Sequence, residues 1–312
     1  LLICGFGIGY YFSRPVESGI GIPKVEGEVR QTEERRILNE NEERLQGEEE
    51  SVYQPAEREV LKPTKGQVAK NGLLINWSSS VTPKQKEVLS LLVGNMVQVD
   101  GGRFRMGGTP EQGSDVYSDE KPVHEVTLSD YYIGKYEVRQ SEWEAVMGSN
   151  PSRFKGEDLP VEQVSWEDCH EFIGRLNALT GLNFKLPTEA QWEYAARGGN
   201  LSKSYKYSGS NNLGEVGWYG SNSGNCTHRV GEKQPNELGL YDMSGNVWEW
   251  CEDWYGGYSV TSQRDPSGAT SGSRRVNRGG CWINVARSCR VSYRNYIMPD
   301  DRGDYLGFRL VC

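Results

Sequence analysis

The sequence is poor in the patterns that many enzyme sites depend on. It holds 3 His among 312 residues, it has no Cys-x-x-Cys pair, and its glycine-rich stretches lack the lysine of a phosphate-binding loop. It also lacks the Gly-x-Ser-x-Gly turn that presents a hydrolase nucleophile. These absences argue against a zinc ribbon, a thioredoxin-type redox centre, a nucleotide phosphate loop and a serine-hydrolase elbow.

Long hydrophobic runs are missing as well. The apolar stretch at residues 1–12 begins without Met and is too short to span a bilayer, which takes about 20 residues. We interpret residues 1–20 as the remnant of a membrane anchor or signal segment; a lipoprotein-type Cys4 and an N-terminal strand are the alternatives. A membrane anchor places the rest of the chain outside the cytoplasm, where disulfides can form.

Positive charge is not in excess. The net charge of −8 argues against general nucleic-acid binding, so the expected partner is an unknown protein or surface ligand. Residues 26–50 are charged, prolines and glycines follow, and the apolar positions keep no heptad register. We therefore expect a charged stalk or linker over residues 21–80 and a globular domain over residues 81–312.

Cysteine occurs seven times, an odd number that cannot pair completely within one chain. Cys169 falls on the apolar face of a predicted helix, so we expect a buried free thiol there. Cys251 and Cys289 each lie inside a motif and are the best candidates for a disulfide. The remaining cysteines of the domain stay unassigned, namely Cys226, Cys281 and Cys312.

Short elements dominate the predicted secondary structure. Thr82 and Ser165 are predicted helix N-caps, and residues 188–191 form a capping box. Alternation on both sides of Asp100-Gly101-Gly102 indicates a hairpin, and residues 123–128 and 131–136 read as two further strands. Few helices and many short strands in one aromatic-rich unit indicate the α+β class.

Several motifs occur in a fixed order between Met96 and Val311. They include Leu-Pro-Thr-Glu-Ala-Gln-Trp-Glu at 186–193, Gly-Asn-Val-Trp-Glu-Trp at 245–250, Arg-Gly-Gly at 278–280 and Gly-Phe-Arg at 307–309. Together they resemble the formylglycine-generating enzyme, or sulfatase-modifying factor, family. The resemblance implies a C-type-lectin-like α+β fold with short strands, few helices and much irregular structure.

The chemistry that the family performs depends on two copper-binding cysteines that follow the Arg-Gly-Gly motif. Soft thiolates suit Cu(I), but Asn284 stands at the first of the two positions. Cys289 falls on the second position only when the segment is counted without gaps. A copper site of Cys281 and Cys289 is one hypothesis; we favour structural thiols in a divergent member that lacks the catalytic pair. The three His of the family's iron-dependent branch have no counterpart.

The resemblance also implies a structural calcium ion beside the Gly-Asn-x-Trp-Glu motif. Hard oxygen ligands suit Ca²⁺, and the matching positions offer two carboxylates and two backbone carbonyls: Asp242, Gly245, Val247 and Glu249. The alternative is that Glu249 pairs with a core arginine while the neighbouring tryptophans pack.

The segment between the last two motifs has its own composition. Residues 283–305 are rich in Asn, Ser, Tyr, Asp, Ile and Val and contain no Lys, Glu or Gln. The tail also resembles the variable proteins of diversity-generating retroelements, which display a changeable binding face on this fold; ordinary drift is the alternative. Tyr, Ser, Gly and Asn suit adaptable binding surfaces. The expected ligand-binding residues are Trp282, Ile283, Asn284, Tyr293, Tyr296 and Tyr305.

Arginines in the tail have two interpretations. They either grip an anionic ligand or pair in the core with Asp300, Asp301 and Asp304; the residues concerned are Arg287, Arg290, Arg294 and Arg302. The leading hypothesis is an extracytoplasmic, membrane-anchored protein that binds a ligand or protein instead of oxidising a cysteine. A copper-dependent oxidase acting on a protein cysteine through Cys281 and Cys289 is the alternative, and a structural subunit of a surface assembly is a third.

Overall fold

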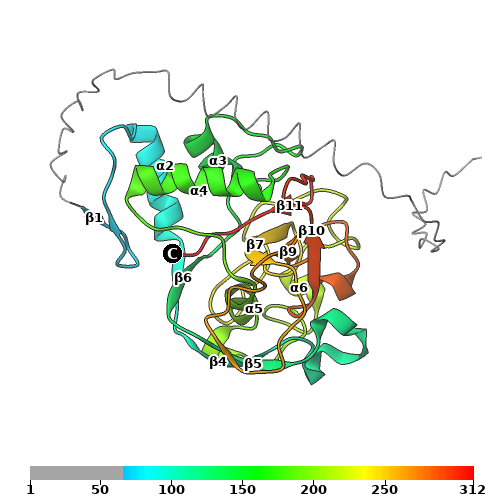
Figure 1. The fold of residues 1–312 in the computed structure, drawn as a ribbon. Helices are drawn as coiled ribbons and strands as arrows, with labels where there is room; N and C mark the ends of the chain where they lie inside the picture. The colour runs from blue at the N-terminus through cyan, green and yellow to red at the C-terminus, as the bar shows by residue number, and fades with distance from the viewer. Residues whose placement is uncertain (1–65) are drawn as a thin grey trace, which may run out of the picture. The chain divides into compact units, whose positions relative to one another are not determined.

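The computed structural model describes residues 66–312, so the expectations for residues 1–65 lie outside the described residues. Short strands, a few helices and long irregular segments make up this part of the chain, which confirms the α+β class (Figure 1). No helix in residues 66–312 combines the length and the apolar character needed to cross a bilayer. The helices are α2 (Pro83–Gly94), α3 (Gln140–Met147), α4 (Trp166–Thr180), α5 (Glu189–Ala196) and α6 (Leu213–Val216), with short 3₁₀ turns at Pro110–Asp115, Ser118–Glu120, Gly199–Leu201 and Ala286–Cys289.

The strands form four small sheets. Two of them are antiparallel pairs: β1 (Gln67–Val68) with β2 (Leu74–Ile75), and β3 (Met96–Val99) with β6 (Tyr131–Gly134). A three-stranded sheet has the order β4 (Gly102–Met106), β5 (His124–Leu128), β8 (Gln263–Arg264). The four-stranded sheet has the order β10 (Arg294–Ile297), β9 (Arg275–Arg278), β7 (Trp248–Trp254), β11 (Leu306–Gly307). Three of the sequence motifs therefore lie side by side in this last sheet.

The hairpin expected around Asp100-Gly101-Gly102 is wrong. The strands on its two sides do not pair with each other, because β3 pairs with β6 and β4 pairs with β5. Gly101 passes so close to the connection between β5 and β6 that an added Cβ would lie 2.3 Å from the Leu128 carbonyl oxygen. Its N–H also donates to the Asp130 carboxylate at 2.7 Å. The close approach holds Asp100-Gly101-Gly102 against this connection, and β3 and β4 leave it to pair with different strands.

The predicted helix starts are confirmed. Thr188 caps α5, because its hydroxyl accepts from the Gln191 N–H and the Gln191 side chain accepts from the Thr188 N–H. Ser165 caps α4 in the same way, and Gly181 ends that helix in the left-handed conformation. Thr82 caps α2, with Pro83 at the first helical position. These starts rest on local chemistry, which explains why the sequence alone predicts them.

Residues 66–80, which the sequence analysis assigned to the linker, pack on the folded domain. The side chain of Asn71 donates to the carbonyl oxygens of Val93 and Met96 at 2.7 and 2.8 Å. Ile75 is fully buried, and Trp77 packs against the same hydrophobic core. The folded unit therefore includes this stretch.

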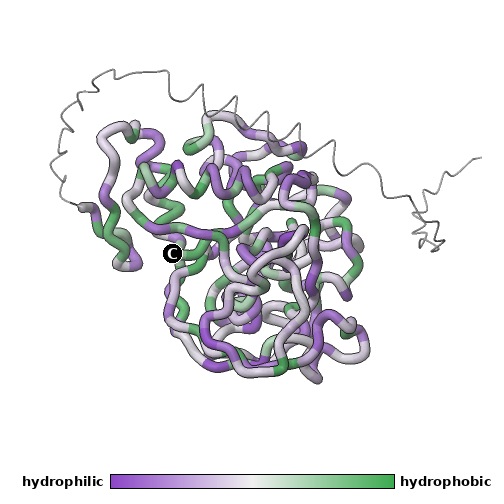
Figure 2. The backbone as a smooth tube through the Cα atoms, in the orientation of Figure 1, coloured by the Kyte–Doolittle hydropathy of each residue, from purple (hydrophilic) through white to green (hydrophobic). Residues whose placement is uncertain are grey.

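The hydrophobic core has two main parts. One part joins α2, α3 and α4 to the tryptophans Trp248, Trp250 and Trp282, and the other surrounds α5 and Trp192. The buried positions of α4 recur three or four residues apart, as an amphipathic helix requires, and the polar positions between them form its other face (Figure 2). Its buried face includes Cys169, which is a free buried thiol as predicted.

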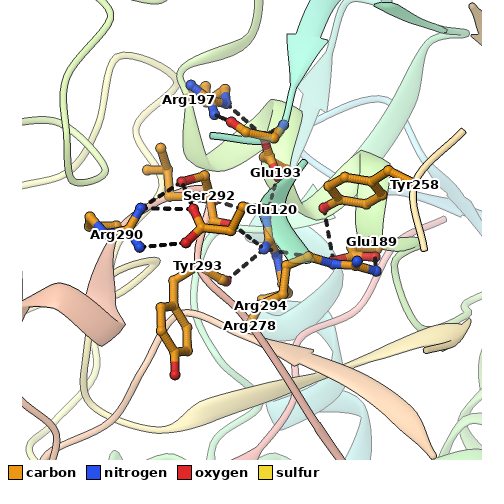
Figure 3. A network of polar contacts seen from close by, with 12 residues as sticks. Glu120, Glu189, Glu193, Arg197, Tyr258, Arg278, Arg290, Ser292, Tyr293 and Arg294 are labelled. Carbon is orange, nitrogen blue, oxygen red and sulfur yellow. Dashed lines mark hydrogen bonds and ion pairs between the residues drawn. The ribbon is translucent and has the colours of Figure 1, made fainter. Parts of the chain in front are cut away.

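Four arginines are buried together with their carboxylate partners (Figure 3 shows three of the pairs). Arg290 contacts Glu120 through two hydrogen bonds of 2.6 and 2.8 Å, and it also donates to Ser292, to Asp115 O and to Arg287 O. Burial by itself raises the pKa of Glu120, but hydrogen bonds from Arg290 and Ser292 outweigh this and lower the pKa overall. The four pairs are Arg278–Glu193, Arg290–Glu120, Arg294–Glu189 and Arg309–Glu249.

We expect the substitution Arg290→Met to lower the free energy of unfolding by about 3–5 kcal/mol, because it leaves the Glu120 carboxylate buried without its cation. The matched control is Arg302→Met, which removes a bidentate but half-exposed pair with Asp168 and should cost about 0–1 kcal/mol. Urea unfolding monitored by tryptophan fluorescence measures both. Equal losses in the two variants would contradict the assigned role of the buried pair.

Candidate functional site

The chain leaves β9 through Gly279 and Gly280, both in the left-handed region with φ of 97° and 75°. An added Cβ on Gly280 would lie 2.6 Å from the Cys289 sulfur, so only glycine permits this approach. The segment that follows folds back on itself and reaches β10 at Arg294. This turn brings the two candidate copper ligands, Cys281 and Cys289, into one region.

Both candidate ligands are buried thiols. The Cys281 sulfur donates to the Asn284 side-chain oxygen at 3.0 Å, and the same oxygen accepts from the Cys281 N–H. Burial raises the pKa of Cys281 to about 12 and lifts the pKa of Cys289 further above its usual range, with the neighbouring Cys281 adding to the second effect. The Cys281 sulfur is engaged by the hard oxygen of Asn284 instead of a second soft ligand, so this arrangement does not favour a copper site.

The disulfide expected between Cys251 and Cys289 is wrong. Both are free cysteines, and they lie in different hydrophobic clusters. Cys251 packs in the cluster around Trp192, and Cys289 packs with Tyr207 and Leu213. All six cysteines in the described part of the chain are free: Cys169, Cys226, Cys251, Cys281, Cys289 and Cys312.

Glu249, a candidate calcium ligand, is occupied by other partners. Its Oε2 accepts from Trp192 Nε1 at 2.7 Å and from Arg309 Nε at 2.6 Å, and its Oε1 accepts from Arg309 at 2.6 Å. The alternative named in the sequence analysis, a core pair with an arginine, is therefore what the structure contains. A buried guanidinium at this position repels a cation, so Glu249 does not fit as a ligand.

Asp242 fits a cation better. Its Oδ2 accepts from the Gly231 N–H at 2.7 Å, while its buried Oδ1 has no hydrogen-bond partner within residues 66–312. Burial is the main cause that raises the pKa of Asp242 to about 6. Burial and the charges of Asp242 and Glu249 raise the pKa of the nearby Glu137 well above its usual range. Glu249 already neutralises Arg309, the guanidinium nearby, so a bound cation would supply the positive charge that the buried carboxyl groups of Asp242 and Glu137 lack.

Side chains alone do not complete a metal site here. Among the described residues, no group of three His, Cys, Asp or Glu side chains is placed to hold a metal ion. A calcium ion at Asp242 would therefore take its remaining oxygen ligands from the backbone. Gly245 and Val247, the other two candidates, offer carbonyl groups on the same loop. Calcium binding itself stays a prediction.

Trp282, one of the six expected ligand-binding residues, faces the interior. It is buried in the core, its ring packs edge-on against Phe154, and its indole N–H donates to Asp304 O at 2.9 Å. Trp282 therefore fixes the loop Gly303–Tyr305 and offers no contact surface. Its expected role as a ligand-facing residue is wrong.

Ile283 and Tyr305 face solvent on either side of Trp282. The exposed fraction of the side chain is 56% for Ile283 and 37% for Tyr305. Asn284 lies beside Ile283 and is half-buried; its carbonyl accepts from the Gly220 N–H at 2.8 Å. The Tyr305 carbonyl accepts from the Trp248 N–H at 2.7 Å, which anchors the Tyr305 backbone to β7.

Tyr293 is half-buried and contacts a segment far away in the sequence. Its ring lies edge-on to Tyr117, with the ring centres 5.6 Å apart, and 5.9 Å from Trp248. Arg287 lies over the other side of this cluster, 5.7 Å from the Tyr117 ring centre. We define the binding face, a candidate surface for a ligand, as Ile283, Asn284, Tyr293 and Tyr305 together with Tyr117 and Arg287.

Tyr296 does not belong to this face. It lies in β10 two residues after Arg294, so the two side chains share one face of the strand. Arg294 enters the core, and Tyr296 follows it to stack on Tyr255 with ring centres 4.0 Å apart. The grouping of Tyr296 with Tyr293 is wrong because the strand alternation separates them.

The tail arginines do not form one anion site. Arg290 and Arg294 are buried in their pairs with Glu120 and Glu189, and Arg302 pairs with Asp168 on the surface. The expectation that these arginines pair with Asp300, Asp301 and Asp304 is also wrong, because their partners are other carboxylates. Arg287 is exposed and, of the four, is the one without a salt bridge to a described residue.

Residues 81–312 match the family profile described as the sulfatase-modifying factor enzyme 1-like domain. The chain belongs to this family. It is 35% identical to a chaperone protein LppX of Paenibacillus barcinonensis, over 70% of this chain and 89% of the relative. It is also 30% identical to the formylglycine-generating enzyme of Thermomonospora curvata, over 69% of this chain and 92% of that enzyme.

A solved structure supports the fold. Variable protein 1 of Treponema denticola superimposes with a TM-score of 0.63 at 36% identity, covering 70% of this chain and 94% of that protein. The C-type-lectin-like fold expected for the sulfatase-modifying factor domain is therefore confirmed. The chain is a divergent member, because Asn284 stands where the family's first copper-binding cysteine is expected.

Two site residues escaped the sequence analysis. Tyr117 joins the binding face only through the tertiary fold, and nothing in its local sequence indicates this. Glu137 had a signal, since it is a carboxylate between Tyr136 and the apolar Val138, but its link to Asp242 depends on the fold.

We expect iodoacetamide to modify Cys226 and Cys312 in the folded protein at pH 8 and to leave Cys281 and Cys289 unmodified. The first two are half-buried, whereas the second two are buried and hold their protons more tightly. Peptide mass spectrometry after a short pulse reads each site, and the same pulse in denaturant is the control. Fast labelling of Cys281 or Cys289 without denaturant would restore a reactive thiol pair.

Proposed function

We propose that the domain is a binding protein that uses the binding face to hold a protein or another surface ligand. One observation carries the proposal: of the ten large apolar side chains that are exposed in residues 66–312, four lie within residues 283–305. The four are Ile283, Val285, Met298 and Tyr305, and Tyr117 adds a fifth beside Tyr293. A concentration of exposed apolar groups on a soluble domain marks an interaction surface.

The chemistry of the face supports the same proposal. Tyrosine and arginine carry much of the binding energy in protein interfaces, and Tyr117, Tyr293, Tyr305 and Arg287 supply both kinds. The backbone below is held in place by Trp282 and by the pair Arg290–Glu120. A rigid base reduces the conformational entropy that binding would otherwise lose.

Two of the similar proteins support a binding role. The Treponema denticola structure carries the name of a variable protein, and the Paenibacillus barcinonensis relative carries the name of a chaperone. We infer a protein partner from the second name and a changeable face from the first. The oxidase alternative would need reactive thiols, and burial disfavours the thiolate forms of Cys281 and Cys289.

We also propose a calcium ion at Asp242 and a location outside the cytoplasm, tethered through the N-terminus. The unpartnered Asp242 oxygen and the surplus of buried carboxyl groups support the ion. The apolar composition of residues 1–12 supports the tether. In this arrangement Glu249 stays with Arg309, and the backbone carbonyls of Gly245 and Val247 join Asp242 at the ion.

A photo-crosslinking amino acid tests the face directly. We introduce this amino acid at position 283 or at position 305 of the full chain and irradiate the cells that produce the protein. We expect both positions to give a crosslink to the same partner. Position 201, also exposed but in another part of the domain, is the matched control. The double variant Ile283→Ser with Tyr305→Ser should then bind the identified partner at least tenfold more weakly, since each lost anchor costs about 1 kcal/mol or more.

Two results would contradict the binding proposal. In the first, position 201 captures the same crosslinked partners equally well, and the double variant binds the partner with an affinity that changes less than twofold. The other is copper-dependent oxygen consumption with a thiol peptide that the substitution Cys289→Ser abolishes. The second result would establish the oxidase instead.

Removal of calcium should lower the melting temperature of the wild-type protein. Calcium at 100 times its dissociation constant adds about 2.7 kcal/mol, which corresponds to roughly 5–10 °C for a domain of this size. The variant Asp242→Asn should lose this response to a chelator, and Asp300→Asn, which is exposed, should keep it. Differential scanning calorimetry with and without chelator measures the effect; a response that survives in Asp242→Asn would place the ion elsewhere.

A further inference from the structure

A small cavity lies beneath the loop that connects β7 to β8, and none of its lining residues belongs to the binding face. Its volume is about 130 Å³. A buried cavity of about 150 Å³ holds a molecule the size of benzene, so this one has room for about five or six non-hydrogen atoms. Its apolar walls are Met106, Ala190 and Ala269, and its polar lining includes Glu189, Asp253 and Arg294.

Two of these polar groups already have their partners inside the protein (Figure 3). Arg294 donates to both Glu189 oxygens at 2.6 and 2.7 Å through Nε and Nη2, and its Nη1 reaches Asp119 O and Gly256 O. Glu189 accepts in addition from the Tyr258 hydroxyl at 3.2 Å. Four of the five Arg294 N–H groups are thus bound to protein oxygens, and its charge is balanced by Glu189, so Arg294 is a poor group to recruit an anion into the cavity.

Asp253 is the polar group that remains open. Its side chain is buried, with 4% of the residue exposed, and its Oδ2 accepts from the Glu189 N–H at 2.8 Å. Its Oδ1 accepts no hydrogen bond from any described residue. An added Cβ on Gly268 would lie 2.7 Å from this oxygen, so the glycine leaves access to it.

One acidic group in the cavity lining has no cationic partner there. Glu189 and Asp253 are acids, whereas Arg294 is the one guanidinium among the lining residues. Burial, with the charge of Glu189 added, raises the pKa of Asp253 to about 8, so the carboxyl group keeps its proton at neutral pH. A bound cation would replace that proton. The apolar walls favour a cation that carries a short hydrocarbon chain over a hydrated metal ion.

We propose that this cavity binds a small protonated amine, with the ammonium group at Asp253 Oδ1 and the alkyl chain against Met106, Ala190 and Ala269. The ammonium supplies the donor and the charge that Asp253 lacks. The alkyl chain of the amine fills the part of the cavity that lies next to the loop between β7 and β8. This site is separate from the binding face, so its failure and the failure of the proposed function are distinguishable.

Calorimetric titration of the full chain with n-butylammonium at pH 8 tests the proposal, with 1-butanol as the neutral probe of similar size. We expect one saturable site for the amine and at least tenfold weaker binding of the alcohol. The variant Asp253→Asn keeps the acceptor for the Glu189 N–H and should remove the preference for the amine. Glu252→Gln is the matched control, because this neighbouring carboxylate pairs with His170 and does not line the cavity.

The dependence on pH has a defined sign. The charged or titratable groups that face Asp253 are Glu189 and Arg294, with Glu252 and Cys251 near it on β7, Arg275 on β9, and His124 and Tyr258 on the cavity wall. Below about pH 8 the amine must displace a proton, so its affinity should fall roughly tenfold for each pH unit. Above pH 8 the affinity should level off until the amine loses its own proton, near pH 10.

A second variant keeps the test decisive if Asp253→Asn does not fold. The substitution Ala269→Leu fills the cavity from the half-exposed loop and should abolish binding of both probes. Absence of saturable amine binding in the wild-type protein would overturn the proposal. Equal binding of amine and alcohol, or amine binding that persists in Ala269→Leu, would do the same.

Discussion

Pairing of buried arginines with buried carboxylates is the interaction on which the rest of this domain depends. Each pair joins elements distant in the sequence: Arg309 with Glu249 across 60 residues, Arg278 with Glu193 across 85 and Arg290 with Glu120 across 170. Both partners of each pair are buried, so water cannot solvate either charge. Each side chain is therefore stable in the core only when its partner is present. In a domain with short strands and few helices, these contacts hold irregular segments at fixed positions.

The same pairing explains what the sequence motifs mean. Arg278 of the Arg-Gly-Gly motif pairs with Glu193 at the end of the 186–193 motif, and Arg309 of Gly-Phe-Arg pairs with Glu249 of Trp-Glu-Trp. Each of these family motifs thus supplies either the arginine or the glutamate of a structural ion pair. They specify the fold and carry no information about copper chemistry. That information lies at Asn284, Cys281 and Cys289, between the motif elements.

Local chemistry was predictable from the sequence, and long-range pairing was not. The N-caps at Thr82, Ser165 and Thr188 depend on residues three positions away, and all three occur as predicted. The strand partners of β3 and β4, the position of Tyr117 and the separation of Tyr293 from Tyr296 depend on contacts between distant segments. The candidate site shows the same division: Ile283 and Tyr305 face solvent as expected, whereas Trp282 turns inward.

The tail segment separates the residues that hold the fold from those that face outward. Trp282, Arg290 and Arg294 enter the interior, and their substitution disturbs buried contacts. Ile283 and Val285 lie between these anchors and Tyr305 follows them, and all three are exposed, so exchanges there cost little stability, typically within about 0.5 kcal/mol. A chain with this alternation tolerates change at its contact surface while the ion pairs keep the backbone in place. This property is what a changeable binding face requires, and it follows from the packing alone.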